Sequence, residues 1–264
     1  MIIRGLEAAA NGMQALINQN DSTANNIANA NTMGYKRQML VFKNIYDSNI
    51  VQQDANGGDV KNIGELSVGC QVQKLTYDFS QGVLTKTENI FDVAIEGDGF
   101  FKVQSPDGEV SYTRNGSFIL NNNGNLVTKD GDYVLDGNGT PIKIKANDVV
   151  MRSLNDIIIT SDGQIELNGQ DDQVMLQKIG VFDFTNKENM NYIGGAKFKP
   201  SDASMQEVRP VNFKIQQGTL ETSNANIVNE MIKTISTSRN YETLSKLVKA
   251  DGDSLSNVMT VGRL

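Results

Sequence analysis

The sequence contains no histidine, no tryptophan and a single cysteine, Cys70. Without histidine, a serine or cysteine nucleophile lacks its usual imidazole base, and a zinc site built from histidine ligands is excluded. One cysteine cannot form a disulfide within the chain. These absences remove most of the common catalytic and metal-binding chemistry, so we expect no catalytic residue, no metal and no cofactor.

Long apolar runs and an excess of positive charge are absent as well. No segment approaches the roughly 18 apolar residues of a transmembrane helix, and the N-terminus lacks the apolar core of a signal peptide. The formal net charge is −7, with −9 on residues 46–217 and +2 on residues 1–45. An acidic centre disfavours nucleic-acid binding, which needs a basic surface. We expect a chain that spans no membrane, binds no nucleic acid, and stays in the cytoplasm or leaves without signal cleavage.

Proline is scarce, and its four copies all fall between residues 106 and 210. Both ends of the chain are therefore free of the residue that most strongly breaks helices. At each end, apolar residues recur at three- and four-residue spacing, which predicts an amphipathic helix. We expect the first helix to end at about Ala28, and the second to be capped by Ser223 or Asn224 and weakened at Gly252.

Each apolar stripe is too narrow to be buried by its own helix, so it needs a partner. That partner is the other terminal helix, a neighbouring copy of the chain, or both. We predict an assembly interface with coiled-coil spacing, and an ordinary helix pair within one chain is the simpler alternative. The residues predicted at this interface are Leu6, Met13, Ile17, Ile27, Val228, Met231, Ile235, Leu244, Val248 and Leu255.

The middle of the chain alternates short Val, Ile, Leu, Phe and Tyr segments with Asn-Gly and Asp-Gly dipeptides. These dipeptides supply the positive φ angles of tight hairpin turns, so the pattern predicts antiparallel strands in a meander or barrel. Residues 46–69 are polar and glycine-rich and predict an extended loop. The expected fold class is α+β, with a discontinuous helical coiled-coil domain (1–45 paired with 218–264) flanking a mainly antiparallel β domain (46–217).

Two patterns in the middle invite a chemical interpretation. Acidic pairs such as Asp92 with Glu96, or Asp98 with Asp107, would suit a glycosidase only if the carboxylates lay about 5–10 Å apart. The cluster 121–125 does not match an EF-hand loop, because a loop that starts at Asn121 has its glycine at position four and Asp132, not glutamate, at position twelve. Acidic and amide residues beside glycine are typical of turns. We therefore predict hairpin turns at these clusters and no enzyme.

Four blocks of sequence carry a more specific signal. They are ANNIANANTMGYK at 24–36, NIFDVAIEGDGFF at 89–101, YTRNGSF at 112–118 and QGTLETSNAN at 217–226. In this order they resemble the signatures of the bacterial flagellar rod and hook proteins, and the length and residues 36–42 resemble the distal-rod branch most. Ala24 stands where the family usually has serine. The signature residues are Asn25, Asn26, Ile27, Ala28, Asn29, Asn31, Thr32, Gly34, Tyr35, Gly97, Gly99, Phe100, Gln217, Gly218, Ser223 and Asn224.

The resemblance implies a structural subunit of the flagellar basal-body rod. Such a subunit would polymerise through its terminal helices into a helical homopolymer, the drive shaft that transmits torque for motility. It would contact other rod and hook proteins, and it would leave through the flagellar type III export apparatus without a cleaved signal to a place outside the inner membrane. A proximal rod protein of the same family, or a secreted β-rich binding module such as an adhesin, is the alternative. For the Asn25–Asn31 run we expect amide side chains that bond backbone groups where the helix ends.

Overall fold

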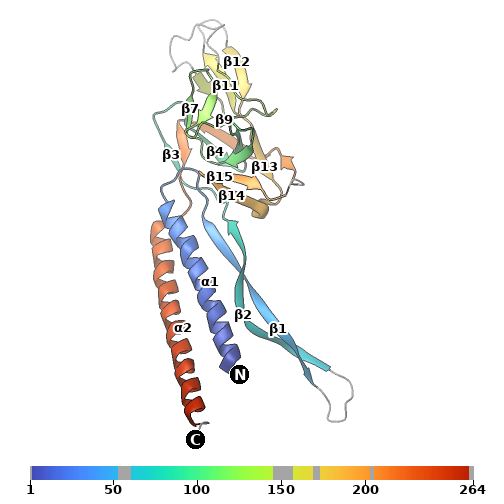
Figure 1. The fold of residues 1–264 in the computed structure, drawn as a ribbon. Coiled ribbons are helices and arrows are strands. Elements are labelled where there is room, and N and C mark those ends of the chain that lie inside the picture. Colours follow the sequence, from blue (N-terminus) through green and yellow to red (C-terminus); the bar gives the residue numbers. More distant parts are fainter. Residues whose placement is uncertain (1, 53–60, 145–156, 169–172, 203–204, 262–264) are drawn as a thin grey trace. The chain divides into compact units, whose positions relative to one another are not determined.

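The protein is described by a computed structural model that covers residues 2–52, 61–144, 157–168, 173–202 and 205–261 (Figure 1). The chain forms two compact units. The helical unit comprises Met1–Ala28, Gln38–Thr76 and Ile227–Leu264, and the β-rich unit comprises Asn29–Arg37 and Tyr77–Asn226. The predicted α+β class is confirmed, with one long helix near each end of the chain and antiparallel strands in the middle.

Two antiparallel helices dominate the helical unit: α1 (Ile2–Ala28) and α2 (Ile227–Val261). A Cβ atom added to Gly12 on α1 would lie 3.3 Å from Leu244 Cδ1 on α2. Nearer the C-terminal end of α1, the Asn26 amide donates to Glu230 Oε2 over 3.2 Å. Both predicted helices are therefore confirmed. The second helix begins a few residues later than expected and remains helical through Gly252.

The helical unit also contains a pair of long strands, β1 (Gln38–Gln52) and β2 (Lys61–Tyr77). Much of the segment expected to be an extended loop, 46–69, is thus a paired ladder, and its residues 53–60 lie outside the described part of the chain. Gly69 has φ of 135°, and an added Cβ would lie 3.3 Å from Ala8 Cα on α1. Pairing between strands and this close packing against a helix order a stretch whose polar composition gives no local strand signal.

Short antiparallel strands build the β-rich unit. The largest sheet has the order β14-β15-β6-β5-β9-β8-β7, with β13 joined to β5 and β16 to β13. Strands β17 and β4 form a two-stranded sheet, as do β18 and β3, and β10, β11 and β12 form a three-stranded sheet. This confirms the hairpin-rich prediction. The elements are β3 (Leu84–Lys86), β4 (Val93–Gly97), β5 (Phe100–Gln104), β6 (Val110–Thr113), β7 (Phe118–Leu120), β8 (Leu126–Thr128), β9 (Tyr133–Val134), β10 (Ile157–Ile159), β11 (Gln164–Asn168), β12 (Gln173–Lys178), β13 (Val181–Phe184), the 3-10 helix η2 (Lys187–Asn189), β14 (Met190–Gly194), β15 (Lys197–Pro200), β16 (Glu207–Val208), β17 (Phe213–Gln217) and β18 (Thr219–Glu221).

The core of the β-rich unit consists of two apolar clusters. The larger cluster is mostly aliphatic and is centred on fully buried residues such as Val93, Ile95 and Phe118. The smaller cluster is aromatic, and Phe198 lies at its centre, with its ring centroid 5.2 Å from those of both Tyr77 and Phe79 in edge-on geometry. The few aromatic residues of the chain are thus concentrated where edge-on pairs add to the stability of the core.

The Asn- and Asp-rich clusters form hairpin turns, as predicted. Asn121 Oδ1 accepts hydrogen bonds from the backbone N–H groups of Asn123 and Asn125, at 3.0 and 2.9 Å. Asp136 Oδ1 does the same for Asn138 and Thr140, both at 2.8 Å. Burial raises the pKa of Asp136, but the hydrogen bonds from this turn outweigh burial and leave the pKa below its ordinary value.

Replacing Asp136 with alanine should lower the free energy of unfolding by about 1–3 kcal/mol, because two backbone N–H groups of the turn lose their charged acceptor. Since the folded-state pKa is below the ordinary 3.8, this stabilisation is fully present above that value and is lost as the pH falls through the lowered pKa. Urea unfolding at pH 7 and at decreasing acid pH measures both effects. Asp107→Ala, in an exposed turn, is the matched control and should change stability little. An equal loss in both variants would contradict the assignment.

Candidate assembly interface

The contact between α1 and α2 is made largely of small and polar residues. The buried residues of α1 are Ala9, Ala15, Ser22, Thr23 and Asn26, and those of α2 are Glu230 and Thr237. Small side chains let the two helices approach closely, but they remove little apolar surface from water. The pairing within one chain therefore leaves most of the large apolar side chains of α2 outside the contact.

The structure divides the predicted C-terminal stripe between two faces of α2. Leu244 and Val248 are half-buried, whereas Val228, Met231 and Ile235 are 64%, 51% and 53% exposed. Ile235 and Leu244 are nine residues apart, which at about 100° per residue places them on opposite faces of the helix. The prediction of one continuous stripe is thus wrong. The six-residue step from Ile235 to the next apolar position breaks the helical periodicity.

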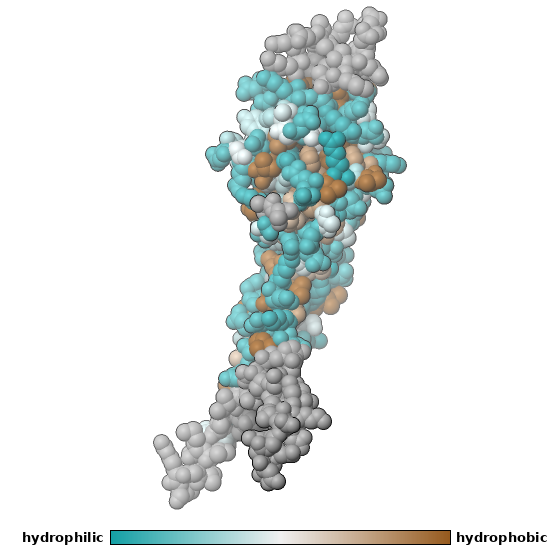
Figure 2. Space-filling model, turned by 90° about the vertical axis from the view of Figure 1, so that its right-hand side faces the viewer, coloured by the Kyte–Doolittle hydropathy of each residue, from teal (hydrophilic) through white to brown (hydrophobic). Residues whose placement is uncertain are grey.

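Four exposed residues near the start of α2 form what we call the outer stripe: Val228, Met231, Ile232 and Ile235. Ile232, which is 59% exposed, was not among the predicted interface residues, although it lies four residues after Val228 and three before Ile235 and so shares their face. On α1, Ile17 is 41% exposed, whereas Leu6, Met13 and Ile27 are half-buried. The side chain of Leu255 lies outside the described residues. In Figure 2, apolar patches interrupt a largely hydrophilic surface.

Asn26 is the central polar residue of the helical unit. Its side chain is 1% exposed; Nδ2 donates to the Gln38 carbonyl at 3.0 Å, and Oδ1 accepts from the Gln38 N–H at 2.7 Å. Nδ2 also reaches Glu230 at 3.2 Å, whose other oxygen pairs with Lys233 at 2.7 Å. One amide thus joins the end of α1, the start of β1 and the start of α2. For Asn26, this confirms the expected bonding between amide side chains and backbone.

Asn26→Ala should destabilise the helical unit by about 1–3 kcal/mol, because the half-buried backbone groups of Gln38 and the buried Glu230 lose their partner. The Gln38 amide should then exchange its hydrogen faster, since its acceptor is gone. Hydrogen exchange followed by mass spectrometry or NMR measures this effect. Asn31→Ala, at an exposed position of the same signature, should leave that exchange rate unchanged. Unchanged protection of Gln38 in the Asn26 variant would contradict the role given to Asn26.

A buried ion triad, Lys36, Arg114 and Glu221, lies in the β-rich unit. Lys36 Nζ is 2.6 Å from Glu221 Oε1, and Arg114 Nη1 is 3.3 Å from Glu221 Oε2. All three residues are at most 2% exposed. Burial lowers the pKa of Lys36 and the pKa of Arg114, and the charge of Glu221 opposes the shift in both. Glu221 therefore compensates both cations, whereas Lys36 and Arg114 repel each other.

The triad and Asn224 hold together three segments near the points where the chain leaves the β-rich unit. Lys36 Nζ donates to the Ser80 carbonyl at 2.8 Å, and the Gly82 N–H donates to Glu221 Oε1 at 2.8 Å. Asn224 Oδ1 accepts from the Arg37 N–H at 2.8 Å, while its Nδ2 donates to the Ser80 carbonyl at 3.0 Å. The expected caps of α2 are thus used elsewhere: Asn224 bonds these segments, and Ser223 accepts from the Ala225 N–H.

The glycines of the signature occupy positions that only glycine fits. Gly34 has φ of 69°, and an added Cβ would lie 2.3 Å from the Asn115 backbone nitrogen. A Cβ atom added to Gly97 would lie 2.4 Å from the Asn212 carbonyl oxygen, and one added to Gly99 would lie 2.5 Å from Val181 Cγ1. Close backbone approach therefore explains these three glycines, together with a positive φ at each.

Other signature residues contribute to packing and to turns. Gln217 donates to the Ile90 and Ile157 carbonyls, both at 3.0 Å. Phe100 is fully buried, with the Arg114 guanidinium 5.3 Å from its ring centroid. The rest take the following places: Tyr35 is buried, Gly218 has φ of 64°, Thr32 donates to the Asn29 side chain, and Asn25, Ala28 and Asn31 are exposed.

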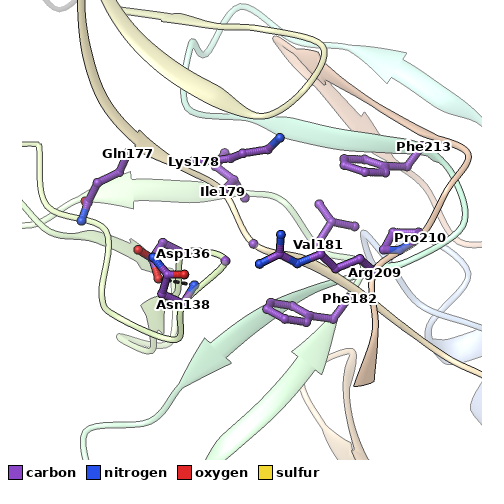
Figure 3. Close-up of a pocket in the computed structure, with 12 residues that line it drawn as sticks. Asp136, Asn138, Gln177, Lys178, Ile179, Val181, Phe182, Arg209, Pro210 and Phe213 are labelled. Atoms are coloured by element: carbon purple, nitrogen blue, oxygen red, sulfur yellow. Dashed lines mark hydrogen bonds between the residues drawn. The ribbon is translucent and has the colours of Figure 1, made fainter. Parts of the chain in front are cut away.

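A pocket of about 500 Å³ lies in the β-rich unit (Figure 3). Arg209 extends into it beside Val181, and Asp136 is the acidic residue among those that line it. The acidic pairs considered from the sequence make structural contacts instead. Asp92 accepts from the Asn89 amide, Glu96 from Gln216, and Asp98 pairs with Lys187. Within the described residues, no group of three or more metal-ligating side chains converges, and no helix has the length and apolarity to span a membrane.

Comparison with known proteins accounts for this arrangement. Residues 6–36 match the family model of flagella basal body rod proteins, residues 94–167 that of the flagellar hook protein FlgE/F/G D1 domain, and residues 216–261 that of the flagellar basal body rod FlgEFG protein C-terminal region. The flagellar basal-body rod protein FlgG of Borreliella burgdorferi is 32% identical over 96% of this chain and 97% of its own. The chain belongs to the flagellar basal-body rod protein family.

Other relatives agree with the predicted resemblance. FlgG of Bacillus subtilis is 29% identical over 99% of this chain and 100% of its own length. FlgF of Mesorhizobium japonicum is 30% identical over 94% of this chain and 93% of its own length. The protein is thus a structural subunit of the flagellar basal-body rod and resembles FlgG, the distal-rod member. The matched segments at the two ends contain most of α1 and α2, and they also contribute Lys36 and Glu221 to the triad.

The triad was not recognised from the sequence, although each member stands in one of the quoted blocks. Glu221→Ala should cost about 3–5 kcal/mol of folding free energy, because Lys36 and Arg114 would remain buried without a counter-charge. Urea unfolding of the full chain measures the loss. Glu96→Ala, which removes an exposed carboxylate, should cost less than about 0.5 kcal/mol. Replacing all three charges by apolar residues of similar volume should cost less than Glu221→Ala alone, and the reverse order would contradict the account of the triad.

Proposed function

We propose that this rod subunit polymerises through its helical unit into a helical homopolymer that transmits torque as a drive shaft. The observation that supports this most strongly is the outer stripe. Its four large apolar residues are each more than half exposed in the single chain. Burying a side chain of this size stabilises an assembly by roughly 1.5–3 kcal/mol, so repeated contacts between copies supply a strong driving force.

We propose that the helices pack in the polymer as a coiled coil. The face of α2 turned toward α1 contains Glu230, Thr234, Thr237, Tyr241 and Leu244, with alternating steps of four and three residues. That spacing is the heptad pattern of supercoiled helices. The polar residues at its start form a weak seam on their own, which supports a role for neighbouring copies in completing the packing.

Torque requires the two units of a subunit to move together. In the helical unit, Asn26 joins three elements next to the points where the chain leaves that unit. In the β-rich unit, Glu221 binds Lys36, just before the chain enters the helical unit. Asn224 donates to the Asp78 carbonyl, just after the chain returns from that unit. We propose that these buried networks keep the chain crossings stiff under load. A buried charge triad suits this role, because its geometry is strongly specified.

For partners and location, we propose contacts with other rod and hook proteins and delivery by the flagellar type III export apparatus without signal cleavage. The assembled subunit would then lie in the cell envelope outside the inner membrane. Membership of the rod family supports these proposals. We further propose the distal rather than the proximal segment of the rod, on the similarity to FlgG. Basal bodies that lack only the proximal segment in a deletion strain would favour the FlgF-like alternative.

The proposal is tested in a strain that lacks the gene. Wild-type protein should restore complete rods and motility, whereas Val228→Asp combined with Ile232→Asp should restore neither, because charges in the outer stripe oppose its burial. Electron microscopy of isolated basal bodies and swimming assays provide the measurements. Far-UV circular dichroism and urea unfolding establish that the variant folds.

Val211→Asp is the matched control, since Val211 is 93% exposed in the β-rich unit. It should assemble and swim normally. Complete rods built from the double outer-stripe variant would contradict polymerisation through this surface. A strain without the gene that still builds complete hooks would instead favour a secreted binding module.

A further inference from the structure

A groove of about 310 Å³ lies between α1 and α2 within the helical unit. We call it the helix groove, and it is lined by Leu16, Ile17, Asn20, Thr237, Ser238, Tyr241 and Glu242. Ile17 and Tyr241, the large side chains of its walls, are 41% and 40% exposed. The chain itself thus leaves an apolar recess open next to the contact of its two long helices.

We propose that the outer stripe of one copy inserts into the helix groove of the next copy. This inference rests on the proposed homopolymer and names the two surfaces that meet in it. The stripe cannot occupy the groove of its own chain, because both lie on the same continuous helix: Ile235 in the stripe and Tyr241 in the groove wall belong to α2. The occupant must therefore come from another molecule.

The relation between the two surfaces determines what kind of assembly they form. The outer stripe and the helix groove consist of different residues, so a head-to-tail contact between them is heterologous and leaves a free stripe at one end of the assembly and a free groove at the other. Contacts of this kind generate rings or open helical filaments, whereas contact between identical patches closes a dimer and stops growth. A rod requires the first kind, and the helical unit carries two surfaces that satisfy it.

Charge favours the same pairing. Arg239 follows Ile235 by four residues and Glu242 follows it by seven, so both lie on the continuation of the stripe along α2. Glu242 lines the groove, and Asp21 follows Ile17 by four residues on the same face of α1. Among the described residues, none forms an ion pair with Arg239, Glu242 or Asp21. In the proposed contact, Arg239 of one copy pairs with Glu242 and Asp21 at the groove of the next, which favours this register over others.

Two variants of the full chain separate the surfaces. Ile232→Asp with Ile235→Asp removes the stripe and leaves the groove intact, and Ile17→Arg obstructs the groove and leaves the stripe intact. Under conditions in which wild type polymerises, each variant alone should remain monomeric in analytical ultracentrifugation. An equimolar mixture should form a 1:1 heterodimer that does not elongate, because one intact stripe meets one intact groove.

Three results would overturn the inference. A mixture that remains monomeric while wild type polymerises would reject the stripe-to-groove pairing alone. A stripe variant that still polymerises would reject it as well, and a groove variant that forms closed dimers would point to contact between two stripes. A wild-type chain that stays monomeric would instead reject the proposed homopolymer, so the two failures are distinguishable.

Milder substitutions serve if a variant does not fold. Ile235→Ser for the stripe and Ile17→Ser for the groove should each raise the critical concentration for polymerisation. Charge reversal provides an independent measurement: Arg239→Glu and Glu242→Arg should each weaken assembly alone, and their mixture should recover association because opposite charges meet again. No recovery in the mixture, with both proteins folded, would contradict the proposed register.

Discussion

The packing of α1 against α2 is the constraint on which the rest of the molecule depends. Where the two helices meet, small and polar residues such as Ala9, Thr23 and Thr237 are buried, and the large apolar side chains of the outer stripe stay in water. Apolar burial is the main driving force of both folding and association. The outer stripe therefore remains as exposed apolar surface that a contact with another molecule would bury.

The β-rich unit follows the opposite rule. Its buried apolar residues gather in two clusters, and Glu221 compensates the buried charges of Lys36 and Arg114. A buried triad of this kind adds little to stability when compared with apolar residues, and its proposed role is to fix the geometry of the segments that it joins. The segments that it fixes lie next to the points where the chain passes to the helical unit. Stiffness at those points is what the proposed transmission of torque would require.

How far the sequence predicts this structure depends on the range of the interactions. Local periodicity predicted both helices, and Asn-Gly or Asp-Gly dipeptides predicted the hairpins, because these signals act over a few residues. The ladder of β1 and β2 was predicted as a loop, since its order comes from pairing and from packing at Gly69. The triad joins residues 36, 114 and 221, and no local pattern shows that such distant charges meet. The apolar stripe on α2 was assigned to one face because the six-residue step after Ile235 was overlooked.

The central claim is that the outer stripe is exposed in the single chain and covered in the polymer. The most direct measurement is the rate at which a thiol reagent labels Ile232→Cys in a Cys70→Ser background, before and after polymerisation. The account predicts fast labelling of the monomer and strong protection in the polymer. A cysteine at position 232 that reacts equally fast in both states would contradict it.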